Sequence, residues 1–406
     1  MSPAANSPDN PIPAVAPPNP PAAPSQNPPT GTPDPAPPDT SAHIPALDGL
    51  RGAAVLLVLV WHYLAFTQPF FPSWAGVDLF FVLSGYLITG RLLATKGGPH
   101  YFSGFYRNRI LRIFPLYYAV ILAFYLFARL LVREANQPQY AWYFEHWKSF
   151  LVFIQNWTLI YDGRPRTIEL VPLWSLAVEE QFYLVWPLII FLIPSPSLRI
   201  KLFSIGIGLV LLARTACYLS DPLSAEPAYF NTFLHLDGLL TGSLLCQLHA
   251  ANIRLPKRWI SALVAASLMA ITLYCTITKS VVPHNPFFAT AGYTVLAILF
   301  AAVLHLAAQP GKTLLNTFLS TRLLRSCGRI SYCLYLIHLP ILIVIGTKLS
   351  AILAKRWPGH ALLASWLALL ICLALSFVLS MLSYRYFESR FLRFKTRQAG
   401  PVQKNP

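Results

Sequence analysis

Ten apolar runs, each about as long as a bilayer-spanning helix, follow one another through residues 44–394 of this chain. A membrane span needs about 20 mostly apolar residues, and only helices or closed barrels satisfy their backbone hydrogen bonds in lipid. Charged residues make up 11% of the chain, against about 25% in soluble domains. The sequence therefore predicts an all-α, polytopic transmembrane helical bundle. We expect spans at 47–68, 74–93, 113–132, 170–193, 200–219, 229–249, 259–278, 287–307, 330–350 and 361–384.

Several segments are not expected to span the membrane. Residues 1–42 hold fifteen of the 36 prolines and no Lys, Arg or aromatic residue, so they have little to bury. We predict a disordered Pro-rich tail over 1–42, a transmembrane domain over 43–394 and a disordered basic tail over 395–406. No basic region leads into an apolar one near the start, so we expect no signal peptide. The apolar segment 149–160 is too short to span and predicts a re-entrant or interfacial piece.

The positions of the basic residues predict the topology. With the first tail in the cytoplasm, twenty Lys and Arg face inward, nine face outward and two lie within spans. Lys and Arg favour the cytoplasmic side, so we expect both termini in the cytoplasm and a multi-pass protein of the plasma (inner) membrane. The net charge of +16 is spread between apolar runs, which predicts contact with membrane lipid and no nucleic-acid partner. The six cysteines form no CxxC pair, and we expect no metal site.

The first span carries three polar residues on one stripe: Asp48, Arg51 and His62. Arg51 and His62 are eleven residues apart, which leaves them about 20° from alignment and about 16 Å apart along a helix. We expect His62 near the bilayer middle and the other two at the cytoplasmic edge. A neutral histidine there can take a proton from a hydroxyl, and an arginine can clamp phosphates. The alternative is a structural histidine and an arginine that anchors a helix end.

The segment 174–183 places Glu179 and Glu180 inside a span. Neighbouring residues on a helix point about 100° apart, so the two carboxylates cannot form a pair on one face. Ser175, Glu179 and Tyr183 share a face at four-residue steps. We expect one glutamate to face the site and the other to contact a neighbouring helix, and the sequence does not say which. Ser175 and Tyr183 are candidate pocket residues.

Arginines gather at the cytoplasmic entry to the third span, at Arg107, Arg109 and Arg112. Arg109 and Arg112 lie about one helical turn apart, which suits a cradle for an anionic cofactor. The alternative is contact with lipid headgroups. Asp78 and His338 are weaker pocket candidates. His235, Asp237 and Arg214 either line the same cavity or pair with one another.

Five ordered motifs resemble the membrane acyltransferase-3 family, the O-antigen acetylase type of integral membrane O-acyltransferase. They are residues 47–52 followed by His62, 76–85, the Arg-x-x-Arg of 109–112, 174–183 and 330–338. The resemblance covers about residues 44–394. It implies a ten-helix enzyme that takes an acyl group, first of all acetyl, from cytoplasmic acyl-CoA. The acceptor it implies is a hydroxyl on an envelope or secreted carbohydrate.

The resemblance also assigns roles to individual residues. It implies that His62 is the leading catalytic residue, with Arg51 in support and Glu179 and Glu180 completing the pocket. Arg109 and Arg112, with Arg107 beside them, would hold the phosphates of coenzyme A. No hydrolase-like domain follows the last span, so we expect no acyl relay to such a domain within the chain. The competing hypothesis is a proton-coupled transporter of a small anionic solute, in which the same polar residues form a proton relay.

Overall fold

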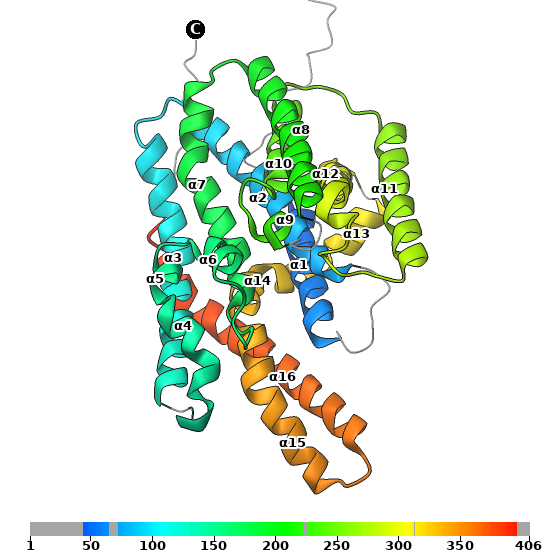
Figure 1. Cartoon of the computed structure of the whole chain (residues 1–406). Helices are drawn as coiled ribbons and strands as arrows, with labels where there is room; N and C mark the ends of the chain where they lie inside the picture. The colour runs from blue at the N-terminus through cyan, green and yellow to red at the C-terminus, as the bar shows by residue number, and fades with distance from the viewer. Residues whose placement is uncertain are drawn as a thin grey trace, which may run out of the picture. The chain divides into compact units, whose positions relative to one another are not determined.

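All regular elements in the described parts of the chain are helices (Figure 1). A computed structural model describes residues 44–64, 72–130, 132, 134–221, 226–311 and 313–395. Within these residues, nine helices are long and apolar enough to cross a membrane. The predicted all-α transmembrane bundle is therefore confirmed. The predictions for the tail 1–42 and for residues 396–406 lie outside the described residues.

The elements follow one another in three groups along the chain. The first group is α1 (Pro45–Tyr63), η2 (Ser73–Ala75), α2 (Gly76–Thr95), α3 (Tyr101–Leu130), η3 (Glu134–Tyr140), α4 (Ala141–Glu145), α5 (Trp147–Leu151) and α6 (Gln155–Tyr161). The second is η4 (Val171–Leu173), α7 (Trp174–Leu192), α8 (Pro196–Ser220), α9 (Glu226–Phe230), α10 (Asp237–Ala250), α11 (Lys257–Thr278) and η5 (Phe288–Gly292). The third is α12 (Tyr293–Ala308), α13 (Leu314–Leu319), α14 (Arg322–Ile341), η6 (Leu342–Gly346), α15 (Thr347–Arg356), α16 (Ala361–Ser383), η7 (Tyr384–Glu388) and α17 (Ser389–Leu392).

One predicted span, 229–249, is not a single helix. It divides into the end of α9 and α10, with irregular backbone over 231–236 between them. The side-chain oxygen of Asn231 accepts hydrogen bonds from the backbone N–H of Phe233 at 2.9 Å and of Leu234 at 3.3 Å. Asn competes with helical hydrogen bonding in this way, so the apolar run alone overestimated the length of the helix.

Two other segments refine the predicted boundaries. The third span was expected to begin at residue 113, but α3 begins at Tyr101. Its 30 residues are about 45 Å long, which exceeds the hydrocarbon core of about 30 Å. The arginine-rich segment is therefore part of the helix. Residues 149–160 do not form a spanning helix, as predicted: they lie in α5, α6 and the turn between them.

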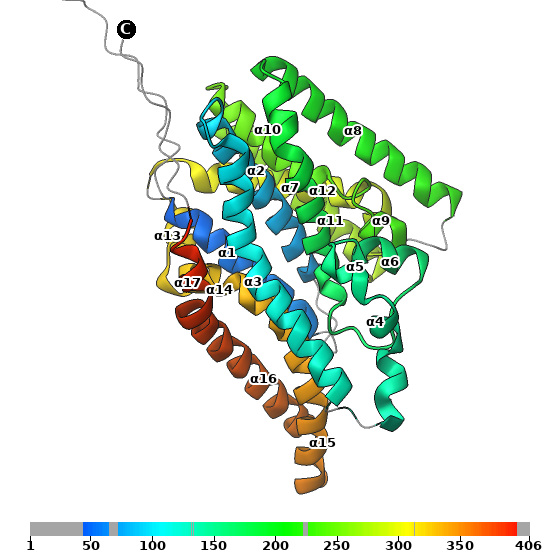
Figure 2. The same cartoon turned by 90° about the vertical axis from the view of Figure 1, so that its left-hand side faces the viewer.

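The central helices pack through glycines. A Cβ at Gly328 of α14 would collide with the backbone carbonyl oxygen of Asp48 on α1. A Cβ at Gly242 of α10 would collide with the backbone carbonyl oxygen of Val82 on α2. Small residues allow such close approach between membrane helices. In its most apolar window α12 is 67% buried, whereas α8 and α11 are each 17% buried. Accordingly α11 lies at the edge of Figure 1 and α8 at the edge of Figure 2.

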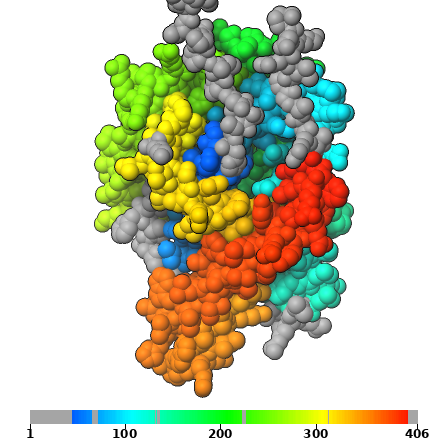
Figure 3. Space-filling model, turned by 180° about the vertical axis from the view of Figure 1, so that it is seen from behind, coloured from blue at the N-terminus to red at the C-terminus, as the bar shows by residue number. Residues whose placement is uncertain are grey.

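The last spans form a long hairpin. Helix α14 continues through η6 into α15, and Pro340 removes one backbone donor just before the wide turns of η6. Helix α16 then returns along α14 and α15. Figure 3 shows α16 and α17, in orange to red, crossing this face beside the yellow segment that includes α13. At the start of α1, Gly49 lies against the backbone of Leu319 in α13, and after the hairpin α17 contacts α3.

Candidate functional site

His62 lies in the last turn of α1, which ends at Tyr63. The helix thus ends earlier than the apolar run 47–68, and the depth of His62 in the bilayer stays a prediction. Trp61 and Tyr63 flank it, and aromatic residues of this kind favour the ends of membrane helices. His62 Nδ1 is 3.1 Å from Nε2 of His338, on α14. The structure thus brings together two predicted site residues that are far apart in the sequence.

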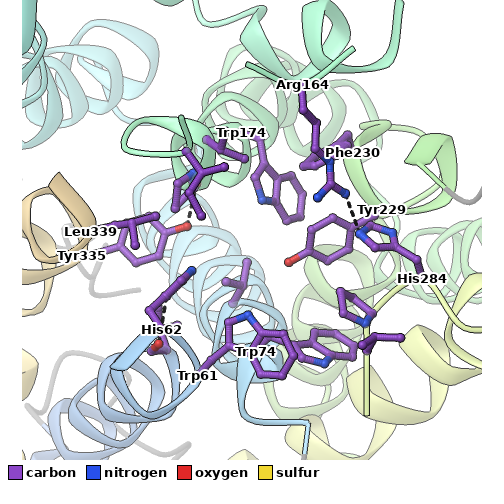
Figure 4. Close-up of a pocket in the computed structure, with 17 residues that line it drawn as sticks. Trp61, His62, Trp74, Arg164, Trp174, Tyr229, Phe230, His284, Tyr335 and Leu339 are labelled. Carbon is purple, nitrogen blue, oxygen red and sulfur yellow. Dashed lines mark hydrogen bonds between the residues drawn. The ribbon is translucent and has the colours of Figure 1, made fainter. Parts of the chain in front are cut away.

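A cavity of about 290 Å³ opens beside His62, at the end of the bundle where α1 ends. We call it the outer cavity. In Figure 4 the His62 ring and the Tyr229 hydroxyl point toward its middle, and Arg164 and His284 lie on the opposite side from His62. Its wall is mostly apolar and includes six aromatic side chains: Trp61, Trp74, Trp174, Tyr229, Phe230 and Tyr335. Trp174 and Tyr335 of these stood in predicted motifs, whereas Trp61, inside the first predicted span, and Trp74, at the start of the second, were not singled out.

Ser175 lies behind the wall of the outer cavity. Its hydroxyl is 2.7 Å from the hydroxyl of Tyr335, which donates to the carbonyl oxygen of Pro172 at 2.7 Å. Arg164 is held by Glu226, with an N–O distance of 2.7 Å, and lies 2.6 Å from Nε2 of His284. The polar groups of this wall are therefore fixed by contacts between loops and helices.

Glu179 and Tyr183, both on α7, connect this helix to α2 and α3. Oε1 of Glu179 accepts a hydrogen bond from Ser84 of α2 at 2.5 Å, and Ser84 accepts one from Tyr183 at 3.1 Å. The guanidinium carbon of Arg109, on α3, lies 5.5 Å from the centre of the Tyr183 ring. Glu179 is thus the glutamate that contacts a neighbouring helix. For Glu180, Oε1 is buried without a hydrogen-bond partner among the described residues.

Five cations gather near the start of α1, and we call this group the basic cluster. Lys395, after α17, is partly buried. Burial and nearby positive charges lower the pKa of Lys395 to about 8, and those charges are on Arg112, Arg109, Arg51 and Arg91. Because like charges resist such proximity, the cluster has the character of an anion site. Neither Lys395, expected in a disordered tail, nor Arg91, which counted only toward the topology, was predicted to lie at this site.

The predicted arginines do not all join this cluster. Arg109 and Arg112 act on Lys395, whereas Arg107 is exposed and is not among the charges that shift it. Arg51 also pairs with Asp48, with an N–O distance of 3.6 Å. Arg51 and Asp48 lie near the start of α1, about 16 Å and about 21 Å along the helix from His62.

The remaining polar candidates pair with one another. Asp78 is buried and lies 2.9 Å from Nε2 of His235. Arg214 and Asp237, both buried, are 2.9 Å apart. These pairs support helix packing beside the outer cavity without lining it. Among the described residues, no three His, Cys, Asp or Glu side chains gather to hold a metal ion.

Comparison with known proteins identifies relatives over most of the chain. A family model described as "Acyltransferase domain" matches residues 44–385. The chain is 30% identical over 390 residues to the peptidoglycan O-acetyltransferase OatA of Listeria monocytogenes, covering 89% of this chain and 56% of that protein. It is 31% identical over 326 residues to the putative peptidoglycan O-acetyltransferase YrhL of Bacillus subtilis, covering 74% and 49%. It is 27% identical over 370 residues to the O-acetyltransferase OatA of Staphylococcus aureus, covering 86% and 57%.

These relatives are longer proteins. The chain spans about half the length of each curated relative given above. No solved structure matches it.

Proposed function

This chain belongs to the acyltransferase-domain family, and from that premise we propose that it is an integral membrane O-acetyltransferase. In this proposal it moves an acetyl group from acetyl-CoA to a hydroxyl of an envelope carbohydrate. The names of the relatives suggest the acceptor class, because two of them are called peptidoglycan O-acetyltransferases. A glycan strand of peptidoglycan is therefore the acceptor to test first.

The outer cavity supports a carbohydrate acceptor. Sugar rings present apolar C–H faces that pack on aromatic side chains, and their hydroxyls need a few polar partners. The cavity offers this combination, with Trp61 and Trp174 in its wall and His62 beside them. A glycan bound in the cavity presents a hydroxyl to the imidazole of His62, which also belongs to the predicted polar stripe on α1.

His62 acts as general base in this proposal. Its Nε2 takes the proton of the acceptor hydroxyl while the oxygen attacks the carbonyl carbon of the acetyl thioester. The carbon–sulfur bond then breaks, the thiolate of coenzyme A leaves, and the imidazolium returns the proton to that sulfur. The products are the acetyl ester and free coenzyme A, and no further reactant is needed.

The basic cluster supports a polyphosphate donor. Arg109 and Arg112 have the bidentate geometry that suits phosphate oxygens, and Lys395 adds a third cation to them. Arg51 links the two ends, since it stands on α1 about 16 Å from His62. An extended pantetheine arm has a comparable length, so a donor held at the cluster can present its thioester near His62.

The single observation that carries the proposal is the position of His62 at the outer cavity, on a helix whose other end enters the basic cluster. The test uses purified protein, labelled acetyl-CoA and soluble peptidoglycan fragments. His62→Ala should lower acetyl transfer about 100- to 10,000-fold, the range of general base catalysis. His360→Ala, which changes an exposed histidine before α16, should transfer acetyl groups normally. Turnover of His62→Ala near the wild-type rate would exclude this assignment.

The same preparation separates an enzyme from a transporter. Label that appears on the glycan supports acetyl transfer. Accumulation of a small anion inside proteoliposomes, with no labelled glycan, would instead support the proton-coupled transporter.

We also propose that the chain lies in the plasma membrane with both termini in the cytoplasm. The excess of Lys and Arg on one side supports this orientation, as does the proximity of Lys395 to Arg51 at the start of α1. Reporter fusions at the two ends should both be active in the cytoplasm, and a periplasmic or external signal from either end would contradict the proposed topology.

A further inference from the structure

The hydrogen bonds of His338 determine which of its ring nitrogens carries a proton. His338 is fully buried in α14. Its Nδ1 lies 2.8 Å from the carbonyl oxygen of Tyr335 and 3.1 Å from that of Leu334. Carbonyl oxygens only accept hydrogen bonds, so Nδ1 of His338 must carry a hydrogen.

His62 has the complementary arrangement. Its Nδ1 lies 3.0 Å from the carbonyl oxygen of Val58 and 3.1 Å from Nε2 of His338. The carbonyl oxygen requires a hydrogen on Nδ1 of His62. A second hydrogen on Nε2 of His338 would face it across 3.1 Å, so that nitrogen must present its lone pair. His338 is therefore neutral with its hydrogen on Nδ1, and His62 in its neutral form likewise carries its hydrogen on Nδ1.

This pairing leaves Nε2 of His62 as the nitrogen with a free lone pair. The His62 ring is directed into the outer cavity in Figure 4. The carbonyl oxygen of Val58 lies four residues earlier in the same helix, where it also accepts from the backbone N–H of His62. Nε2 of His338 is a second acceptor for the Nδ1 hydrogen of His62, and because it comes from another helix it restricts the ring plane as well as the tautomer.

We propose that His338 is a positioning residue that holds His62 in the tautomer and orientation needed for catalysis. This inference rests on the proposed function, in which His62 is the general base. When His62 takes the acceptor proton on Nε2, its Nδ1–H keeps donating to His338, which spreads the positive charge. The proton goes from the hydroxyl to His62 only, and His338 retains its own hydrogen throughout.

The place of His338 in α14 supports this role. Tyr335, one turn earlier, forms part of the cavity wall, and the hydroxyl of Tyr63 donates to the carbonyl oxygen of His338 at 3.4 Å. The wall of the acceptor site and the partner of the base therefore come from the same helical turn, so a shift of α14 would move both together.

Two substitutions of His338 separate positioning from packing. In His338→Leu the hydrogen-bond acceptor is lost, and in His338→Gln an amide oxygen can take the place of Nε2. We expect His338→Leu to lower kcat about 10- to 100-fold, the range for outer partners that orient a functional imidazole, with both KM values within about twofold of wild type. His338→Gln should recover most of the lost kcat.

The chain offers a matched control in a second histidine pair. Nε2 of His249 and Nδ1 of His305 are 2.8 Å apart, with ring centres 5.0 Å apart against 4.9 Å for His62 and His338. This pair lies outside the outer cavity. His305→Leu removes a similar hydrogen bond and should leave kcat unchanged. An equal loss in both leucine variants would indicate general destabilisation and overturn the positioning role.

A spectroscopic measurement tests the tautomer directly. In protein labelled with ¹⁵N-histidine, the His62 signals are those missing from His62→Ala. Wild type should show His62 with hydrogen on Nδ1, and His338→Leu should shift the population toward hydrogen on Nε2. Hydrogen on Nε2 in wild type would overturn the inference, even if His338→Leu does not fold.

The two proposals fail in distinguishable ways. An active His62→Ala variant removes the proposed function and the inference with it. An inactive His62→Ala variant beside a fully active His338→Leu variant removes only the role of His338.

Discussion

Lys395 gives the sharpest test of the proposed donor site, because its charge responds to pH in an accessible range. Burial and the arginines of the basic cluster lower the pKa of Lys395 from 10.5 to about 8. In the free protein Lys395 is therefore about nine-tenths charged at pH 7 and about one-tenth charged at pH 9. A bound polyphosphate offsets the repulsion and raises the pKa toward its ordinary value, so binding takes up a proton above pH 8.

The direction and size of the effect follow from this linkage. Donor affinity is greatest below the pKa of the free protein and falls as the pH rises above about 8. Complete restoration of the pKa to 10.5 would weaken binding about tenfold between pH 7 and pH 9. Because Lys395 is partly exposed, solvent screening leaves only part of this effect, roughly two- to fivefold.

The assay is calorimetric titration with S-ethyl coenzyme A, a thioether that does not hydrolyse at pH 9. Lys395→Met should bind it about two- to fivefold more weakly than wild type at pH 7, and the two affinities should converge at pH 9. Arg393→Met, which removes an exposed charge from the same segment, should show the wild-type pH dependence. Parallel curves for wild type and Lys395→Met would refute the reasoning, because the lysine would then not contact the donor.

Three further predictions concern the acceptor, an ion pair and the packing of α1. Trp61→Ala should raise the KM for the glycan about three- to tenfold without changing the KM for the donor. Trp259→Ala, which changes an exposed tryptophan, is the control. An unchanged KM for the glycan in Trp61→Ala would contradict the cavity assignment. Arg214→Met should cost about 3–5 kcal/mol of stability, because it leaves the buried carboxylate of Asp237 unpaired. Thermal unfolding in detergent measures this, and adding Asp237→Asn should recover part of the loss if the ion pair is responsible. Gly328→Ala should lower the unfolding temperature, since a methyl group would meet the α1 backbone; an unchanged temperature would show that the two helices can separate freely.

The positions of most helices follow from the sequence alone. Nine of the ten predicted spans correspond to apolar helices of sufficient length, because the thickness of the hydrocarbon core imposes a length that each segment satisfies on its own. Residue type and helical period on α1, α3 and α7 also made His62, Arg109 and Glu179 candidates, and their roles stay predictions.

The end of α1 and the break before α10 were harder to predict. Apolar length gave the run 47–68, but the helix ends at Tyr63. In the same way, Asn231 interrupts an apolar stretch by accepting backbone hydrogen bonds. Such local interactions depend on backbone geometry that a count of apolar residues does not contain.

By itself the sequence determined that the chain crosses a membrane repeatedly and that a few polar residues lie on its helices, since burial in lipid acts on each segment separately. Only the tertiary structure decided which of these residues meet. His338 reaches His62 across 276 positions, and Ser84 selects Glu179 over Glu180. Lys395 joins arginines from three helices. The helical period defines which face a side chain occupies, but the neighbour on that face is chosen by how all the helices pack together.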